Sequence, residues 1–149
     1  MAFNRIASFV VASQLDPTSN TNTETAAEIV AASTDGNTLV YSNSPQGTIG
    51  FVDITDPAAP VGLGELDMAG EPTSVTVLGN YVLVAVNTSF DLQGNPDFVN
   101  PSGKLVAVNI STQEILREWD LGGQPDSIAV SPDGTYAVIA IENERDEKF

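Results

Sequence analysis

An internal repeat constrains the fold of this 149-residue chain more than any other feature of its sequence. The segment AAEIVAASTDGNTLVYSNS, which starts at Ala26, aligns with QPDSIAVSPDGTYAVIAIE, which starts at Gln124. A third copy, EPTSVTVLGNYVLVAVN at 71–87, lies between them and lacks two residues before its turn glycine. Three copies of one pattern predict one supersecondary unit that is repeated along the chain, with neighbouring units stacked on each other.

The segments that connect these copies repeat as well. GTIGFVDIT, from Gly47, matches GKLVAVNIS, from Gly103. ELDMAGEP, from Glu65, matches EWDLGGQP, from Glu118. Because three matched blocks recur in one order, chance does not explain the similarity.

The sequence of each unit predicts four short antiparallel strands. In the second unit we expect them at 73–78, 81–87, 103–110 and 113–120, where Val, Ile and Leu are frequent. TDGN and SPDG are typical of hairpin turns, in which glycine supplies a positive φ. No segment combines a helical period with caps over ten residues, so we expect no helix.

Four-stranded units at this spacing predict an all-β fold, namely a partial β-propeller of about two and a half four-stranded antiparallel blades. A β-sandwich is the alternative, but it does not require the recurring (E/D)-x-x-G-x-P joint. We expect one domain, 1–149. It divides into a lead-in strand and polar loop at 1–26, blade 1 at 27–70, blade 2 at 71–123 and half of blade 3 at 124–149.

The blade count favours a piece of a longer propeller, since closed propellers have four to eight blades. A protomer that assembles into a ring is the alternative, and open sheet edges would then support self-association. The segment MAFNRIASFVVASQL predicts a strand at about 5–12. Its single Arg and short apolar stretch leave a signal peptide as the second interpretation.

Composition excludes several classes of function. Five basic against 20 acidic residues give a formal net charge of -15, which disfavours nucleic acid and anionic membranes as partners. No apolar run approaches the 18–20 residues of a membrane span. The chain has no Cys and no His, so disulfides, the usual zinc sites and Ser-His-Asp triads are excluded.

Acidic residues are predicted to converge on one rim of the central channel. In an antiparallel blade the first strand begins where the second ends, and this places Glu28, Thr73 and Asp126 beside Asn43-Ser44, Asn87 and 142–144. The insertion 88–102 should lie over the same rim. Carboxylate and amide oxygens suit Ca²⁺. The candidate metal ligands are Glu28, Asp126, Glu142, Asn143 and Glu144.

A solvated acidic rim is the alternative, because DLQGNPD does not match a calcium-loop pattern. Recurring residues elsewhere predict structural roles. Asp53 and Asn109, like Asp67 and Asp120, should bond turn amides. We expect Glu65 and Glu118 to be solvated and Trp119 to pack between blades. Arg117, Lys104 and Arg145 are too scattered to form a phosphate-binding patch.

The quoted blocks, above all DLGGQPDSIAVSPDGTYAVIAIENERDE, resemble large, mostly exported bacterial propeller proteins. These are described as phytase-like, with an esterase-like activity of phytase, and are often labelled alkaline phosphatase or choice-of-anchor surface proteins. The resemblance runs from about residue 5 and implies a secreted or surface-attached protein that binds calcium. It also implies hydrolysis of phosphate esters by metal-assisted attack of water.

The matching motifs carry Glu28, Asp126, Asp146 and 142–144, and none of these residues can be assigned a catalytic role. ENERDE is followed here by Lys148 and Phe149, and this differs from the family pattern, in which the resemblance implies that further blades follow. Two functions follow. The first is binding or structure, through a cation-binding rim with a protein or phosphate-ester ligand. The second is a metal-dependent phosphoesterase with an incomplete active rim.

Overall fold

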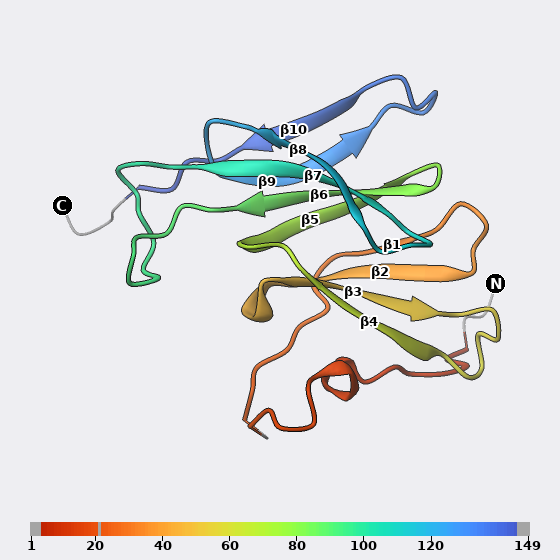
Figure 1. Ribbon diagram of the computed structural model, residues 1–149. Coiled ribbons are helices and arrows are strands. Elements are labelled where there is room, and N and C mark those ends of the chain that lie inside the picture. The colour runs from red at the N-terminus through yellow and green to blue at the C-terminus, as the bar shows by residue number, and fades with distance from the viewer. Residues whose placement is uncertain (1–3, 21, 146–149) are drawn as a thin grey trace.

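The protein is all-β. The computed structural model describes residues 4–20 and 22–145 (Figure 1). In these residues the only helices are two short 3₁₀ turns, η1 (Val11–Gln14) and η2 (Ser44–Gln46). None of the helices described is long and apolar enough to cross a membrane.

The strands of the described residues form two four-stranded antiparallel sheets and one two-stranded hairpin, and strands that are consecutive in sequence are neighbours in each sheet. The first blade contains β1 (Val30–Ala32), β2 (Thr38–Asn43), β3 (Thr48–Asp53) and β4 (Val61–Asp67). The second contains β5 (Glu71–Leu78), β6 (Tyr81–Asn87), β7 (Gly103–Asn109) and β8 (Ile115–Asp120). The hairpin joins β9 (Pro125–Val130) and β10 (Ala137–Ile141). This arrangement confirms the predicted partial β-propeller.

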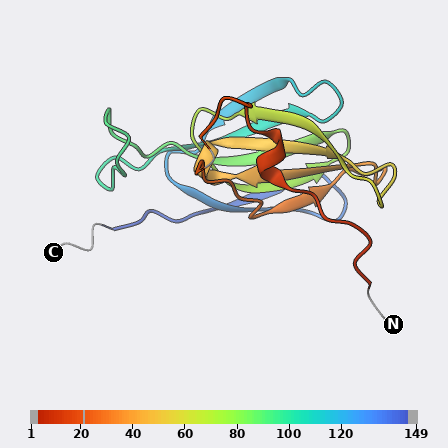
Figure 2. The same ribbon diagram turned by 90° about the horizontal axis from the view of Figure 1, so that it is seen from below.

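The sheets stack face to face, as Figures 1 and 2 show. Because side chains alternate along a strand, the middle blade has to be apolar on both faces. Val82, Val84 and Val86 of β6 are buried in the core between the first two blades. Leu83 and Ala85 are buried on the opposite face, toward the hairpin. The continuous apolar run VLVAV thus reflects a blade that is covered on both sides.

Two hairpin turns repeat in atomic detail. Gly36 and Gly134 have φ of 75° and 69°, the left-handed region that favours glycine. In the same turns, the hydroxyls of Ser33 and Ser131 donate at 2.6 Å to Asp35 and Asp133. These bonds lower the pKa of both carboxyls. The shared geometry shows that the sequence repeat is a structural repeat.

The predicted strand at 5–12 is wrong. Residues 4–10 pair with none of the strands, and the 3₁₀ turn η1 follows. A strand needs an edge whose backbone groups can pair with it, and here the side chain of Gln14 occupies that edge instead. Gln14 accepts from the N–H of Gly64 at 2.6 Å and donates to the Tyr41 hydroxyl at 2.8 Å. The lead-in therefore covers the outer face of the first blade through side-chain bonds (Figure 1).

Candidate cation-binding rim

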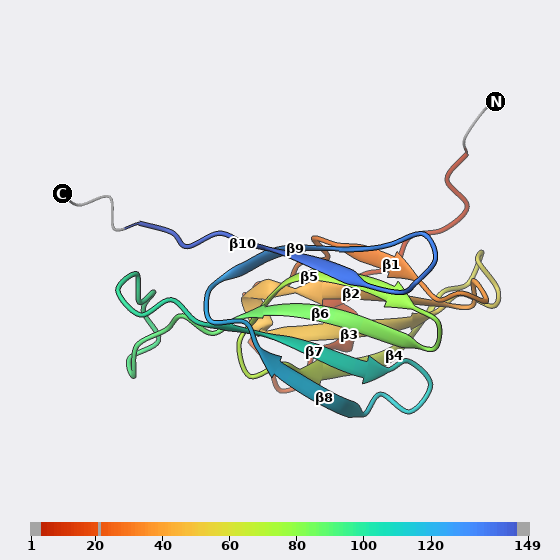
Figure 3. The ribbon, with the colours of Figure 1, turned by 90° about the horizontal axis from the view of Figure 1, so that it is seen from above.

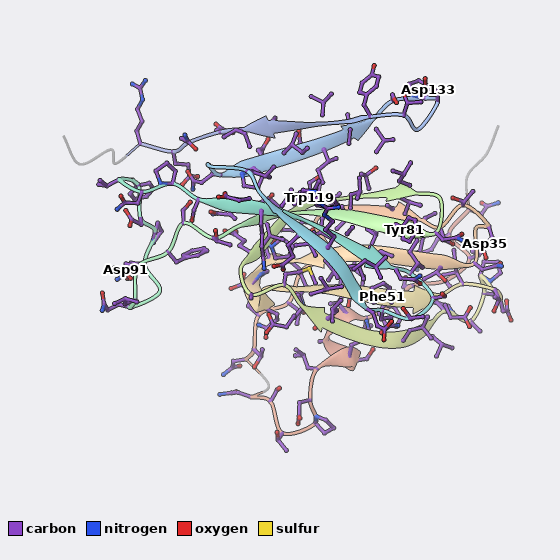
Figure 4. All side chains as sticks on the ribbon, turned by 45° about the horizontal axis from the view of Figure 1, so that its top comes forward. Asp35, Phe51, Tyr81, Asp91, Trp119 and Asp133 are labelled. Atoms are coloured by element: carbon purple, nitrogen blue, oxygen red, sulfur yellow. The ribbon has the colours of Figure 1, made fainter. Side chains whose placement is uncertain are left out.

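The predicted rim lies at one end of the stacked blades. The starts of β5 and β9 and the ends of β2, β6 and β10 lie at this end, together with η2 and the loop 88–102 (Figure 1). In Figure 4 Asp91 of this loop lies on the side opposite the hairpin turns that contain Asp35 and Asp133. The structure thus brings together segments that are far apart in sequence.

A β-bulge occurs in the first strand of the second blade and of the hairpin, and an equivalent hydrogen-bond pattern immediately precedes β1 in the first blade. The pairing of β5 with β6 shifts between Pro72 and Ser74, which leaves Thr73 without an opposing residue. In the hairpin the same shift leaves Asp126 unopposed. In the first blade Ser42 opposes two residues, since it bonds both Glu28 and Ile29. Bulges re-aim side chains, so the three residues predicted to open the strands share one backbone feature.

Hydrogen bonds across the rim link the blades. The Thr73 hydroxyl donates to the carbonyl oxygen of Pro125 at 2.8 Å, which ties the second blade to the hairpin. The Ser44 hydroxyl donates to the Glu28 carboxylate and lies 2.8 Å from the carbonyl oxygen of Pro72. Glu28 therefore has a role in the joint between the first two blades, besides its predicted role as a metal ligand.

An asparagine at or just beyond the end of each second strand holds the chain that enters the same blade. Asn43 accepts from the N–H of Ala26 at 2.9 Å, and Asn143 accepts from the N–H of Gln124 at 3.0 Å. Asn87 donates to Glu71 at 3.3 Å. This role was not predicted from the sequence, although an Asn recurs near the end of all three copies.

The other predicted ligands lie at the surface of the rim. Asp126, Glu142 and Glu144 are exposed. The backbone N–H groups of Glu142 and Glu144 donate to the buried Gln124, at 2.8 and 2.7 Å. Within residues 4–20 and 22–145, no group of three or more acidic side chains is close enough to hold a metal ion. Asp146 lies outside the described residues. The ligand set therefore stays a prediction.

A cavity of about 510 Å³ opens at the same end of the molecule, between the first two blades. The residues that line it include Asp67, Glu71, Ser44 and Phe90. It therefore offers oxygen atoms and one aromatic surface to a ligand.

The loop 88–102 is braced by its own polar groups. Ser89 is buried, and its hydroxyl donates to the carbonyl oxygen of Ser102 at 2.8 Å. Asn95 donates to Asp91, and this bond is the main reason that the pKa of Asp91 is lowered. The loop therefore presents the exposed carboxylate of Asp91 beside the rim.

The structural roles predicted for recurring Asp and Asn residues are confirmed. Asp53 accepts from the N–H of Thr55, and Asn109 accepts from the N–H of Ser111. Asp67 and Asp120 do the same for Ala69 and Gly122. Each side chain bonds a backbone amide two residues further on, the geometry of an Asx-turn.

Glu65 was predicted to be solvated, and this is wrong. It lies on the outer face of the first blade, where it accepts hydrogen bonds from Tyr41, Asn43 and Thr48 at 2.9, 3.0 and 3.0 Å. A partly buried carboxylate needs such donors. The equivalent Glu118 is exposed and pairs with Lys104 at 2.8 Å.

Trp119 was predicted to pack between blades, but its side chain is 38% exposed. The guanidinium of Arg117 lies over the ring, 5.1 Å from its centroid. Trp119 is opposite Leu105 on the outer strand of the second blade, on the side that faces the hairpin. Within the part of the chain that the structure describes, the hairpin contributes two strands, and Trp119 stays partly exposed beside them.

Tyr41 links stability to alkaline pH. Burial is the main cause that raises the pKa of its hydroxyl above the ordinary value of 10.0. The unfolded chain therefore loses this proton at a lower pH than the folded chain does, and the contribution of Tyr41 to stability falls as pH rises above about 10.

We expect the melting temperature of Tyr41→Phe to fall less between pH 9 and pH 11 than that of the parent protein. Tyr136→Phe, at an exposed site, serves as the control; an equal slope in both variants would contradict this expectation.

Comparison with known proteins identifies the family. The model of the choice-of-anchor I domain matches residues 28–149. No curated protein matches the chain. Among solved structures, it resembles the hydrazine synthase of Kuenenia stuttgartiensis with a TM-score of 0.63 and 18% identity. It also resembles a functionally unknown protein from Desulfotomaculum acetoxidans, with a TM-score of 0.56 and 11% identity.

These alignments cover 78% and 74% of this chain but only 30% and 31% of the solved chains, so the chain spans about a third of their length. At such identities the likeness concerns the fold alone. The family match covers most of the chain, from the first bulge residue through the third repeat. The protein therefore belongs to the choice-of-anchor I domain family.

Proposed function

We propose that this chain is a binding or structural module of a surface-associated β-propeller, and that its acidic rim attracts divalent cations, Ca²⁺ above all. The observation that carries the proposal is the repeated bulge, which sets Glu28, Thr73 and Asp126 at equivalent positions on one end of the blades. Membership of the choice-of-anchor I domain family supports the surface location.

The chemistry of the rim fits a hard cation. Ca²⁺ takes six to eight oxygen ligands, including carboxylates, amide oxygens and backbone carbonyls. The rim offers all three types, through Glu142, Asn143 and the carbonyl oxygen of Pro125. A net charge of -15 also raises the local concentration of cations around the protein. The side chains would have to turn toward the ion, since the acids are not gathered in advance.

A direct test is a calcium titration followed by calorimetry and by melting temperature. We expect Ca²⁺ to raise the melting temperature of the parent protein, because a ligand that binds only the folded state stabilises it. The double variant Glu28→Gln/Asp126→Asn should bind Ca²⁺ at least about tenfold more weakly, a change of about 1.4 kcal/mol.

The matched control removes charge at the opposite end of the blades. Glu114 is exposed in the turn between β7 and β8, and Glu114→Gln should leave calcium affinity within about twofold of the parent value. Equal weakening by Glu114→Gln and by the rim variant would mean a diffuse counterion effect and would reject the rim site. Failure of Ca²⁺ to bind at all would reject the cation proposal outright.

The phosphoesterase alternative has no specific geometric observation in its favour. In the described residues no three acidic side chains converge, and the bases Arg117 and Lys104 lie on β8 and β7, occupied with Trp119 and Glu118. The geometry therefore supports the binding role better than the phosphoesterase role.

A further inference from the structure

Another cavity, of about 510 Å³, opens between the first two blades at the end opposite the rim. Residues from three turns contribute to it, and Figures 1 and 3 show that these turns lie at the same end of the blades: β1–β2, β5–β6 and β7–β8. In Figure 4 Asp35 marks this end. We propose that the cavity binds a neutral carbohydrate, with one sugar ring held between the two blades.

The cavity lies beside a turn that is shorter than its copies. The turn of the first blade reads STDGN, whereas the turn of the second blade reads LGN and lacks two residues before its glycine. The space beside this Gly79 is open, because a Cβ added there would meet no atom within 4 Å. The cavity is thus found where two copies of the repeat differ in length, between two blades that each have four strands.

Most of the residues that line the cavity are polar. They supply hydroxyl groups, one carboxylate, one amide and one aliphatic side chain, in that order from Ser33, Thr34, Thr38 and Ser111; Asp35; Asn80; and Ile110. Among the described residues the lining contains no Lys and no Arg. A phosphate, sulfate or carboxylate ligand would therefore find no compensating positive charge in the cavity.

The hydrogen bonds already made at the cavity leave mainly acceptors for a ligand. The hydroxyl of Thr34 donates to the carbonyl oxygen of Gly79 at 3.0 Å, and the hydroxyl of Ser33 donates to Asp35 at 2.6 Å. A hydroxyl that donates still has lone pairs with which to accept. The bond from Ser33 is the main reason that the pKa of Asp35 is lowered, so this carboxylate only accepts. Such walls fit a ligand with several O–H donors.

Asn80 and Ile110 complete the match to a sugar. Asn80 is exposed in its turn, and its amide offers two N–H donors to ligand oxygens. Ile110 is partly buried and offers an aliphatic surface on which the C–H face of a sugar ring can pack. The one carboxylate, Asp35, already accepts from the side chain of Ser33 and from the backbone and side chain of Asn37. It therefore needs no cationic ligand.

Hydrogen bonds hold the three turns together without a ligand. The bond from Thr34 to Gly79 joins the first blade to the second. The N–H of Ile110 donates to the carbonyl oxygen of Asn80 at 3.1 Å and joins the turn β7–β8 to the turn β5–β6. Walls that are positioned in advance lower the cost of ordering on binding. The volume of about 510 Å³ lies within the range of about 300–1,000 Å³ of small-molecule sites.

The test is an NMR titration of the isotope-labelled protein with methyl α-glucoside, methyl α-mannoside, methyl β-galactoside and N-acetylglucosamine. We expect at least one of these sugars to shift the amide signals of Asp35, Gly79, Asn80 and Ser111, while the signal of Glu142 at the rim stays unchanged. Because the ligand is neutral, its affinity should change less than about twofold between about 0.05 M and about 0.5 M NaCl.

Variants of the cavity and of an equivalent turn make the matched comparison. Asn80→Ala removes the amide donors and should weaken binding at least about fivefold. Ser111→Phe adds a large side chain to the lining and should weaken binding at least as much, by occupying space. By the repeat, Thr135 holds the position of Asn80 in the turn β9–β10, where it is exposed and outside the cavity. Thr135→Ala should keep the affinity within about twofold of the parent value.

Several results would overturn the proposal. One is the absence of shifts at the cavity with every sugar. Another is equal weakening by Asn80→Ala and Thr135→Ala. A third is tighter binding of methylammonium than of the sugars, with a loss of more than about tenfold at the higher salt, since Asp35 would then be a cation site. The calcium test changes Glu28 and Asp126 at the opposite end, so its outcome and this one are independent.

Discussion

Replacing Phe51 by Ala should cost the protein about 3–5 kcal/mol of its free energy of unfolding. Phe51 is the largest side chain among those fully buried, and it lies in the core shared by the first two blades. Its loss leaves a cavity that β-sheet backbones on both sides cannot collapse to fill. For a chain of this size we expect the melting temperature to fall by about 10 °C or more, measured by circular dichroism.

Phe90 supplies the matched control for this prediction. It lies in the loop 88–102, is 40% exposed and pairs only through one isolated bridge, to Pro96. Phe90→Ala should change stability by less than about 1 kcal/mol. Similar losses in the two variants would mean that the blades do not share one core, and would contradict the stacking described above.

The second large effect is expected for Gly50→Ala. Gly50 is opposite Tyr41 in the first blade, and an added Cβ would overlap the Tyr41 ring. The ring cannot swing away freely, since Gln14 and Glu65 both bond its hydroxyl. Overpacking of this kind costs about 1–3 kcal/mol or more, and denaturant unfolding measures it.

A double-mutant cycle with Tyr41→Ala separates this clash from a general effect of the substitution. If the ring is the cause, Gly50→Ala should cost clearly less in the Tyr41→Ala background than in the parent protein. An unchanged cost would place the strain in the backbone and remove Tyr41 from the explanation.

Most of the fold could be predicted from sequence because the repeat carries it. The strands of the second blade were expected within two residues of their observed ends, since Val-rich runs and turn glycines mark both ends. The strand expected at 5–12 failed because periodicity does not show whether an edge is available to pair with. Here Gln14 bonds Gly64 with its side chain.

The site was predicted only in part. Strand direction was enough to place Glu28, Thr73 and Asp126 at one end of the blades, because antiparallel topology fixes which strand ends meet. It could not show that Asn143 bonds Gln124, or that Glu65 is held by three donors. Such contacts depend on where side chains from different strands meet, and the sequence repeat does not encode these distances.

Gln14 and its neighbours cover the outer face of the first blade, so the two ends of the stack of blades differ in how easily a further sheet could pack against them. On that side the exposed surface is polar chain, and a further sheet could pack there only after Gln14 released Tyr41 and Gly64. On the hairpin side no such lock exists among the described residues. Further blades are therefore expected to pack on the hairpin side only. If the blades close into a ring, the last blade could pack against the first blade only after the two Gln14 bonds have opened.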